Sequence, residues 1–355
     1  MSTYGTARVT GVTRWGPGAQ EAGLRFEDGE EARGIVLTGL VGEVTAGDRV
    51  IVNTTAIGLG LGSGGYHYVL WNLERAELDT GGSGHVMKLR YTPLQLNVEA
   101  VEETLGALED PSRAIAGMPV VAGELHSQLL PVALAYRDAR PDGRLVYVMT
   151  DGGALPAALS NTVRFLRDGD YLQGVITCGQ AFGGDLEAVT VFGALLGARE
   201  RLGADAVVAL MGPGIAGTGS AVGFSGLEQA VVLNACGSLG GLPLAIPRIT
   251  FRDERARHVG LSHHTAMVLG TATHIRAVVP VPEMEGGRMD QVMDDLRAAG
   301  ADEKHDIRRV DASAVLRLID ECGFPATVMG RGPDLEPEYF MAAGAAGILA
   351  AEGGY

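Results

Sequence analysis

The spacing of apolar residues divides the chain into two parts with different expected secondary structure. Up to about residue 80, short apolar or alternating segments recur about every ten residues, a spacing typical of a small barrel or sandwich. Turns rich in Gly, Glu and Asp separate these segments. The expected strands are 7–12, 22–26, 33–37 and 48–52. We therefore predict a small N-terminal β-barrel-like module over residues 1–80.

The pattern changes near residue 118, where fully apolar strand segments begin to alternate with segments of helical periodicity. This alternation predicts βαβ units and a mostly parallel sheet. The expected strands are 118–124, 144–150, 173–178, 205–211, 243–250, 275–281 and 306–310. The expected helices are 127–140, 156–168, 188–202, 225–239, 263–273, 288–299, 312–322 and 336–351. We predict a Rossmann-like α/β sandwich over residues 118–355, joined to the barrel by a connector over residues 81–117.

Four successive strands of the predicted sheet run directly into polar or glycine-rich turns. These turns are 124–128, 150–153, 177–187 and 211–220. Ligands of open parallel sheets bind outside the carboxyl ends of the strands, so the turns are expected to share one edge and one site. The structural alternative is that every turn from strand to helix needs Gly and an N-cap residue.

Four side chains in these turns are candidates for catalysis. His126 opens a helix after one strand, and Asp151 and Asp185 follow the next two strands, so they offer acid–base partners. Cys178 ends a strand before a glycine, where backbone amides lower a thiol pKa and favour a nucleophile. Three of them also have a structural interpretation: His126 as a hydrogen-bonded residue at a helix start, Asp151 as an N-cap or turn residue, and Cys178 as a core thiol.

A divalent metal is a candidate cofactor. The candidate ligands are His126, Asp151, Asp185, His263 and His264, and His258 is a further candidate ligand or acid–base partner close to the last two in the sequence. Their spacing matches no specific metal motif. Ser262 is a natural N-cap residue, so the two adjacent histidines have a second interpretation as ordinary residues of the first helical turn.

The turn 211–220 is a candidate anion site. Gly212, Gly214 and Gly217 match the letters of a dinucleotide fingerprint, but the next helix starts late, near Ser225, and no acidic residue ends the next strand. We therefore do not expect NAD. The backbone amides of the turn are expected to hold a small anionic ligand instead. The residues assigned to this cradle are Gly212, Gly214, Gly217, Thr218, Gly219 and Ser220. After the turn, Ser225 and Glu228 have the spacing of a capping box.

Composition excludes several classes of function. The net charge of −15, without a cluster of Lys and Arg, disfavours nucleic acid as a partner. Apolar runs are too short for a membrane span, and the N-terminus lacks the pattern of a signal peptide. Three widely spaced cysteines suit the cytoplasm. Lys88 and Lys304 are the only lysines, which leaves few candidates for Schiff-base chemistry or a P-loop.

Several motifs together resemble an uncharacterised bacterial family of unknown function. They are 52–66, 85–93, 177–187, 211–219 and 262–265. The resemblance extends over most of the chain and implies no activity, cofactor or catalytic residue.

The Ala/Gly-rich segment 341–351 suggests close helix packing and, with it, a homo-oligomer.

The leading hypothesis is an enzyme, a hydrolase or a group transferase, that acts on a small anionic metabolite at the carboxyl edge of the sheet. A metabolite-binding or sensing protein is the second hypothesis, and it predicts no histidine–carboxylate pair within reach of the ligand. An assembly protein is the third, and it predicts no sizeable pocket at the strand ends.

Overall fold

The computed structural model describes residues 3–62, 64–82 and 84–353 of the chain. It divides into two compact units, Met1–Glu99 and Ala100–Tyr355. Within the described residues, no helix has both the length and the apolar character needed to cross a bilayer.

The first unit is built on a closed five-stranded barrel, which confirms the predicted β-barrel-like module. Its strands follow the order β1-β2-β3-β5-β4 around the barrel. Their bounds are β1 (Tyr4–Gly16), β2 (Ala19–Phe26), β3 (Glu31–Leu37), β4 (Arg49–Asn53) and β5 (Tyr66–Asn72). Alternate residues point inward and fill the interior with apolar side chains, among them Val9, Leu24, Val36, Val50 and Val52.

Short elements complete this unit. They are α1 (Thr38–Val41), α2 (Thr55–Gly58) and the antiparallel pair β6 (Val86–Lys88) and β7 (Leu96–Val98). The strand β5 was not predicted, because the glycine-rich segment before it ends the alternating pattern.

The second unit is an α/β sandwich around one eight-stranded parallel sheet, as predicted. The strand order is β11-β10-β9-β12-β8-β13-β16-β17. The bounds are β8 (Pro119–Ala122), β9 (Leu145–Thr150), β10 (Gly174–Cys178), β11 (Leu186–Ala188), β12 (Ala206–Met211), β13 (Leu242–Ala245), β16 (Val278–Pro282) and β17 (Asp306–Val310). The expected strand 243–250 ends earlier, at Ala245, and a separate hairpin follows it, formed by β14 (Ile249–Thr250) and β15 (Gly260–Leu261).

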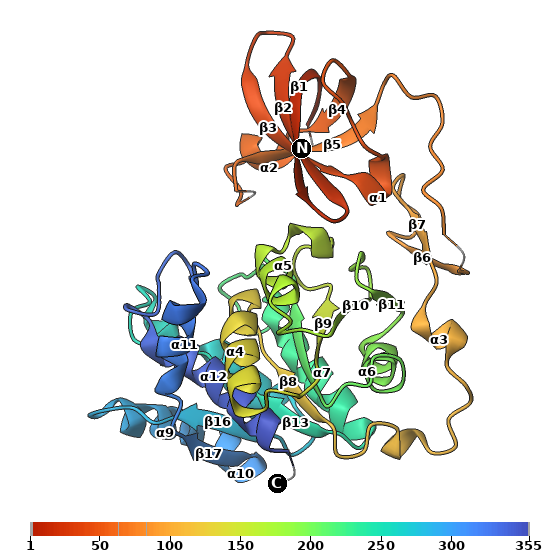
Figure 1. The fold of residues 1–355 in the computed structure, drawn as a ribbon. Coiled ribbons are helices and arrows are strands. Elements are labelled where there is room, and N and C mark those ends of the chain that lie inside the picture. Colours follow the sequence, from red (N-terminus) through yellow and green to blue (C-terminus); the bar gives the residue numbers. More distant parts are fainter. Residues whose placement is uncertain (1–2, 63, 83, 354–355) are drawn as a thin grey trace. The chain divides into compact units, whose positions relative to one another are not determined.

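Helices cover both faces of the sheet (Figure 1). The core of one face is formed with α4 (Leu129–Ala139), α5 (Asn161–Asp168), α11 (Ala314–Cys322) and α12 (Pro337–Glu352). The core of the other face is formed with α6 (Val191–Glu200), α7 (Glu228–Ser238), α9 (Arg288–Ala298) and the π-helical turn η6 (Val268–Ala272). Shorter helices are α3 (Val101–Thr104), α8 (His263–Met267) and α10 (Ala301–Lys304).

The Ala/Gly-rich helix α12 packs inside its own unit. A side-chain carbon on Gly347 would lie 2.4 Å from the carbonyl oxygen of Val132 in α4, so only glycine lets the two helices approach this closely. Gly344 plays the same part against Val315 of α11. This intramolecular contact accounts for the small residues that suggested a homo-oligomer.

The chain reverses its direction across the sheet between β8 and β12. After β8 the chain passes through α4 on one face to β9, whereas after β12 it passes through α7 on the other face to β13. The turns that leave these two neighbouring strands therefore diverge. In open α/β sheets such a divergence opens a crevice at the carboxyl ends of the strands, where ligands bind.

Candidate functional site

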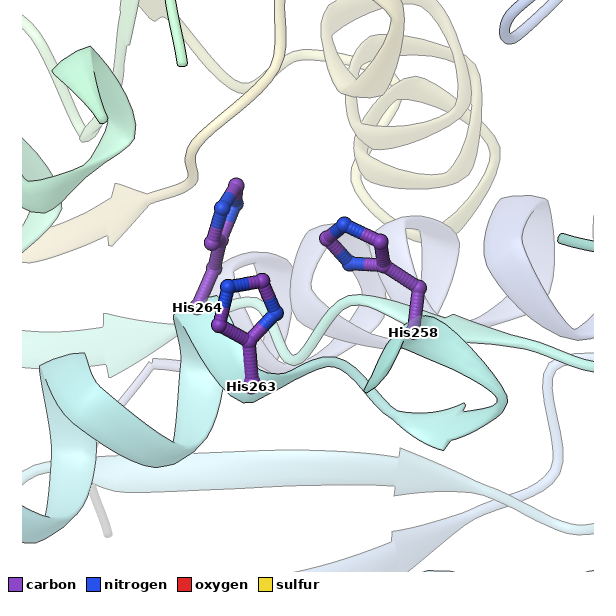
Figure 2. Close-up of side chains that lie close together, drawn as sticks. All are labelled: His258, His263 and His264. Carbon is purple, nitrogen blue, oxygen red and sulfur yellow. The ribbon is translucent and has the colours of Figure 1, made fainter. Parts of the chain in front are cut away.

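Three histidines converge beside this crevice. His258 belongs to the 3₁₀ turn η5 (Ala256–His258), and His263 and His264 open α8. One ring nitrogen from each can be chosen so that all three lie within 4.8 Å of one another. The three rings lie on the same side of the segment that carries them and face one another (Figure 2). All three residues were among the candidate metal ligands or acid–base partners of the sequence.

The local fold of this segment brings the rings together. Ser262 caps α8, because its hydroxyl oxygen accepts a hydrogen bond from the backbone N–H of His264. Gly260 has φ +83, and an added side-chain carbon would lie 2.5 Å from a carboxylate oxygen of Asp295. That carboxylate accepts a hydrogen bond from the N–H of Leu261 at 3.0 Å. The hairpin before α8 is therefore fixed at the position from which both histidines emerge.

Two of the rings are oriented by polar neighbours. Nδ1 of His264 lies 3.4 Å from Oε1 of Glu124, the second residue after β8. Nδ1 of His258 lies 2.7 Å from the hydroxyl of Ser262. When both Nδ1 atoms carry the hydrogen, both Nε2 atoms are left as metal ligands. The ring of Phe224 stacks on His264 with a centroid distance of 3.7 Å and an interplanar angle of 1°.

Glu124 also belongs to a buried network of charges. Its Oε1 accepts a hydrogen bond of 2.8 Å from Arg248, and both side chains are almost fully buried. The Arg248 guanidinium lies 3.6 Å from Asp253, which accepts two side-chain hydrogen bonds of 2.8 Å from Arg255. These hydrogen bonds hold the pKa of Asp253 well below its usual range. The network therefore carries its own compensating charges.

The protonation states of the site favour a metal. Burial, followed by the charges of Arg248, Arg255 and His264, lowers the pKa of His258 to about 3. Burial and the neighbouring His264 lower the pKa of His263. Burial alone would raise the pKa of Glu124, but the hydrogen bond from His264 and the charge of Arg248 outweigh it and lower that pKa. At neutral pH His258 and His263 are thus neutral imidazoles near an ionised carboxylate, and both forms suit a metal centre.

Several buried polar atoms of this cluster have no hydrogen-bond partner within the described part of the chain. They are both ring nitrogens of His263, Oε2 of Glu124 and Nε of Arg248. Buried polar groups are nearly always hydrogen-bonded, and the His263 nitrogens and the Glu124 oxygen among these atoms are of the kinds that bind a metal, whereas the Arg248 Nε–H is not.

The distances also bear on which group fits. Zinc lies about 2.0–2.1 Å from imidazole nitrogens, so a tetrahedral site needs nitrogens about 3.4 Å apart. The three ligand atoms lie within 4.8 Å of one another, and a movement of about an ångström by the rings closes this difference. The residues present therefore fit a transition metal held by three histidines.

His126, the first catalytic candidate, lies on the other side of the same turn. Its Nδ1–H donates to the carbonyl of Met211 at 3.1 Å, so Nε2 accepts the hydroxyl hydrogen of Ser160 at 2.7 Å. Burial lowers the pKa of His126 to about 4. The residue lines a cavity of about 420 Å³. It is placed at the carboxyl edge as predicted, and its catalytic role stays a prediction.

The other three catalytic candidates have separate local partners. The carboxylate of Asp151 accepts a hydrogen bond from the N–H of Gln180 at 2.8 Å. Asp185 forms an ion pair of 2.9 Å with Arg167 and accepts the N–H of Val175. Cys178 is 3 % exposed and belongs to the core under the sheet. The structure thus gives these side chains positions that also serve the fold, and their roles in catalysis stay predictions.

The glycine-rich turn after β12 has two different parts. Gly212 touches the turn after β9, where a side-chain carbon on Gly153 would lie 2.2 Å from the Gly212 carbonyl oxygen. Farther along, Gly217 pairs with Phe224, and the N–H of Thr218 donates to the carbonyl of Gly223 at 2.7 Å. The second part is an exposed turn whose base places Phe224 over His264. Binding of an anion by the amides of this turn stays a prediction.

The capping box predicted for Ser225 and Glu228 does not form. Ser225 begins the 3₁₀ turn η4 (Ser225–Leu227), and its hydroxyl accepts the N–H of Ala216. The Glu228 carboxylate instead accepts a hydrogen bond from the hydroxyl of Thr150. Burial raises the pKa of Glu228 to about 7 despite that hydrogen bond. The box does not form because the Ser225 N–H already donates to the carbonyl of Ala216 at 2.8 Å.

The class of protein that this fold and site define is an α/β protein with a three-histidine centre at the carboxyl edge of its sheet. The model of a family described as "Protein of unknown function (DUF3866)" matches residues 33–347. The chain belongs to this family, and the family resemblance seen in the sequence is confirmed. No match was found among curated proteins.

Proposed function

We propose that the chain is a metal-dependent hydrolase whose metal is held by His258, His263 and His264. The observation that carries the proposal is the convergence of the three rings beside the buried Glu124–Arg248 pair. A zinc ion on three histidines keeps a fourth position open and lowers the pKa of water bound there. Hydrolysis is therefore favoured over group transfer, the other chemistry that the sequence left open.

The residues around the rings have separate parts in this proposal. Glu124 is a positioning residue, because its carboxylate fixes the Nδ1–H tautomer of His264. The hydroxyl of Ser262 fixes the Nδ1–H tautomer of His258 in the same way. Phe224 covers one face of His264 and keeps water from it. The open coordination position suits an anionic or polarised oxygen of a small substrate, in agreement with the expected anionic metabolite.

Two observations favour this proposal over the alternatives from the sequence. A binding protein without catalysis was expected to lack a histidine–carboxylate pair near its ligand, whereas His264 and Glu124 form one. An assembly protein was expected to lack a pocket at the strand ends, whereas the cavity beside His126 lies there. None of the three cysteines forms a disulfide, which agrees with an enzyme of the cytoplasm.

The test compares metal-free and zinc-loaded protein, with p-nitrophenyl acetate and p-nitrophenyl phosphate as general substrates. We expect one zinc ion per chain and hydrolysis that requires it. The variant His258→Ala should lose both, while His274→Ala, which changes an exposed histidine, should keep both. Failure to bind zinc would refute the proposal. Stoichiometric zinc with no zinc-dependent hydrolysis would refute its catalytic part.

A further inference from the structure

A cavity of about 420 Å³ lies at the carboxyl edge of the sheet, and none of the three histidines of the centre lines it. Its wall comes from the turn after β8, the start of α5, residues 213–215 and the segment 324–329. Pockets of about 300–1,000 Å³ are typical of small-molecule sites, so the cavity is large enough for a metabolite.

The wall of this cavity carries no charge. Among the described residues that line it, none is Asp, Glu, Lys or Arg. Apolar contact comes from residues such as Leu130, Ile215 and Phe324, and hydroxyl groups come from Ser127 and Thr162. The one ionisable group is His126, whose pKa is lowered to about 4 by burial, so it is neutral at physiological pH.

An uncharged wall selects against ions. A charged group that enters such a space loses its hydration and finds no opposite charge, and this cost is large. A neutral molecule keeps the gain from apolar contact and satisfies its polar atoms with the hydroxyls. The chain as a whole has a net charge of −15, so the neutrality of this wall is a local property.

The cavity and the histidine centre share a wall. The side chains of Glu124, Ile215 and Phe224 meet around Gly226, each within 3.4 Å of the position of an added side-chain carbon. Ile215 lines the cavity, while Glu124 and Phe224 contact His264. A ligand in the cavity is therefore one layer of side chains away from the centre.

We propose that this cavity binds an uncharged small molecule with an apolar body and a hydrogen-bonding group. Its preference for a neutral ligand does not rest on the proposed hydrolase function, because a layer of side chains separates the cavity from the histidine centre.

Three probes of nearly equal shape separate charge from size. Benzamide is neutral, benzoate is an anion and benzamidinium is a cation. Titrations followed by NMR of the ligands, with the full metal-free chain, should show benzamide binding about tenfold more tightly than either ion. Because these titrations need no metal, a failure of the metal proposal leaves their result intact.

Substitutions at one position locate the binding. Thr162 lines the cavity near the start of α5 and is partly exposed, so the chain should tolerate changes there. Thr162→Trp should abolish benzamide binding by filling the space, and Thr162→Arg should reverse the preference toward benzoate. Ser238→Arg is the matched control, because Ser238 is exposed at the end of α7 that lies at the opposite edge of the sheet.

The outcomes are decisive in both directions. Neutral preference that disappears in Thr162→Trp and inverts in Thr162→Arg, with Ser238→Arg unchanged, supports the proposal. Equal binding of the three probes, binding that survives Thr162→Trp, or no binding of any probe overturns it. Circular dichroism of each variant confirms that the fold is retained.

Discussion

Replacement of His263 by alanine is the most direct probe of the metal centre. His263 is partly exposed and neither ring nitrogen has a hydrogen-bond partner in the described part of the chain. Its removal therefore sacrifices little of the fold, and we expect the free energy of unfolding to change by less than about 1 kcal/mol. The substitution is therefore expected to remove one metal-ligating side chain and little else.

The expected loss of zinc affinity follows from the number of ligands. Four-ligand zinc sites in small domains bind with about 10–16 kcal/mol, which is about 2.5–4 kcal/mol for each ligand. At about 1.4 kcal/mol for each factor of ten, His263→Ala should weaken zinc binding by about 100–1,000-fold. The geometry therefore predicts that His263→Ala loses much of its zinc affinity while its free energy of unfolding changes little.

The assay is a competition titration of zinc against a chromophoric chelator at pH 7, with thermal unfolding of the same metal-free samples. His274→Ala is the control, since this exposed residue is tied to Asn234 through its backbone N–H and keeps that bond without its ring. Affinity of His263→Ala within threefold of the parent chain would refute the reasoning. An equal loss in His274→Ala would assign the zinc to surface histidines.

Three further substitutions test the network and the fold. Glu124→Gln leaves Arg248 buried beside a neutral amide, so chemical denaturation should show a loss of about 3–5 kcal/mol, and a loss below about 1 kcal/mol would contradict the buried pair. Glu228 has its pKa raised from 4.5 to about 7, so its contribution to stability is complete below pH 4.5 and disappears as the pH rises through 7. Urea unfolding should therefore show Glu228→Gln gaining up to about 3 kcal/mol over the parent chain between pH 5 and pH 8, and a difference that is the same at both pH values would rule this out. Gly347→Val forces α12 away from Val132 and should cost about 1–3 kcal/mol in thermal unfolding, whereas an unchanged midpoint would mean that the helices can separate freely.

The regular elements of the second unit could be predicted because burial leaves a strong pattern. Strands such as β9 and β12 are buried at every residue, and their continuous apolar runs differ clearly from the helical segments between them. The strand β11 was missed because its three residues lie inside a glycine-rich turn. Its position depends on pairing with β10, which only the folded chain provides.

The candidate site was predicted in part for a similar reason. His263 and His264 were identified because they are adjacent and follow an N-cap residue. The importance of Glu124 could not be predicted, since its partner Arg248 is 124 positions away. Their contact depends on β8 and β13 being neighbours in the sheet, and strand order is a property of the packed fold. Glu124 does stand in a turn that was identified, where His126 seemed the stronger candidate.

The contact between Gly153 and Gly212 limits how this site can diversify. Each glycine faces backbone of the other turn at 2.2 Å from an added side-chain carbon, so neither turn can gain a side chain there or move alone. The inner parts of the two turns therefore have to change together. New specificities in relatives should arise instead by substitution in the exposed turn 216–222 or at the exposed positions 325, 327 and 329, where added atoms meet solvent rather than main chain.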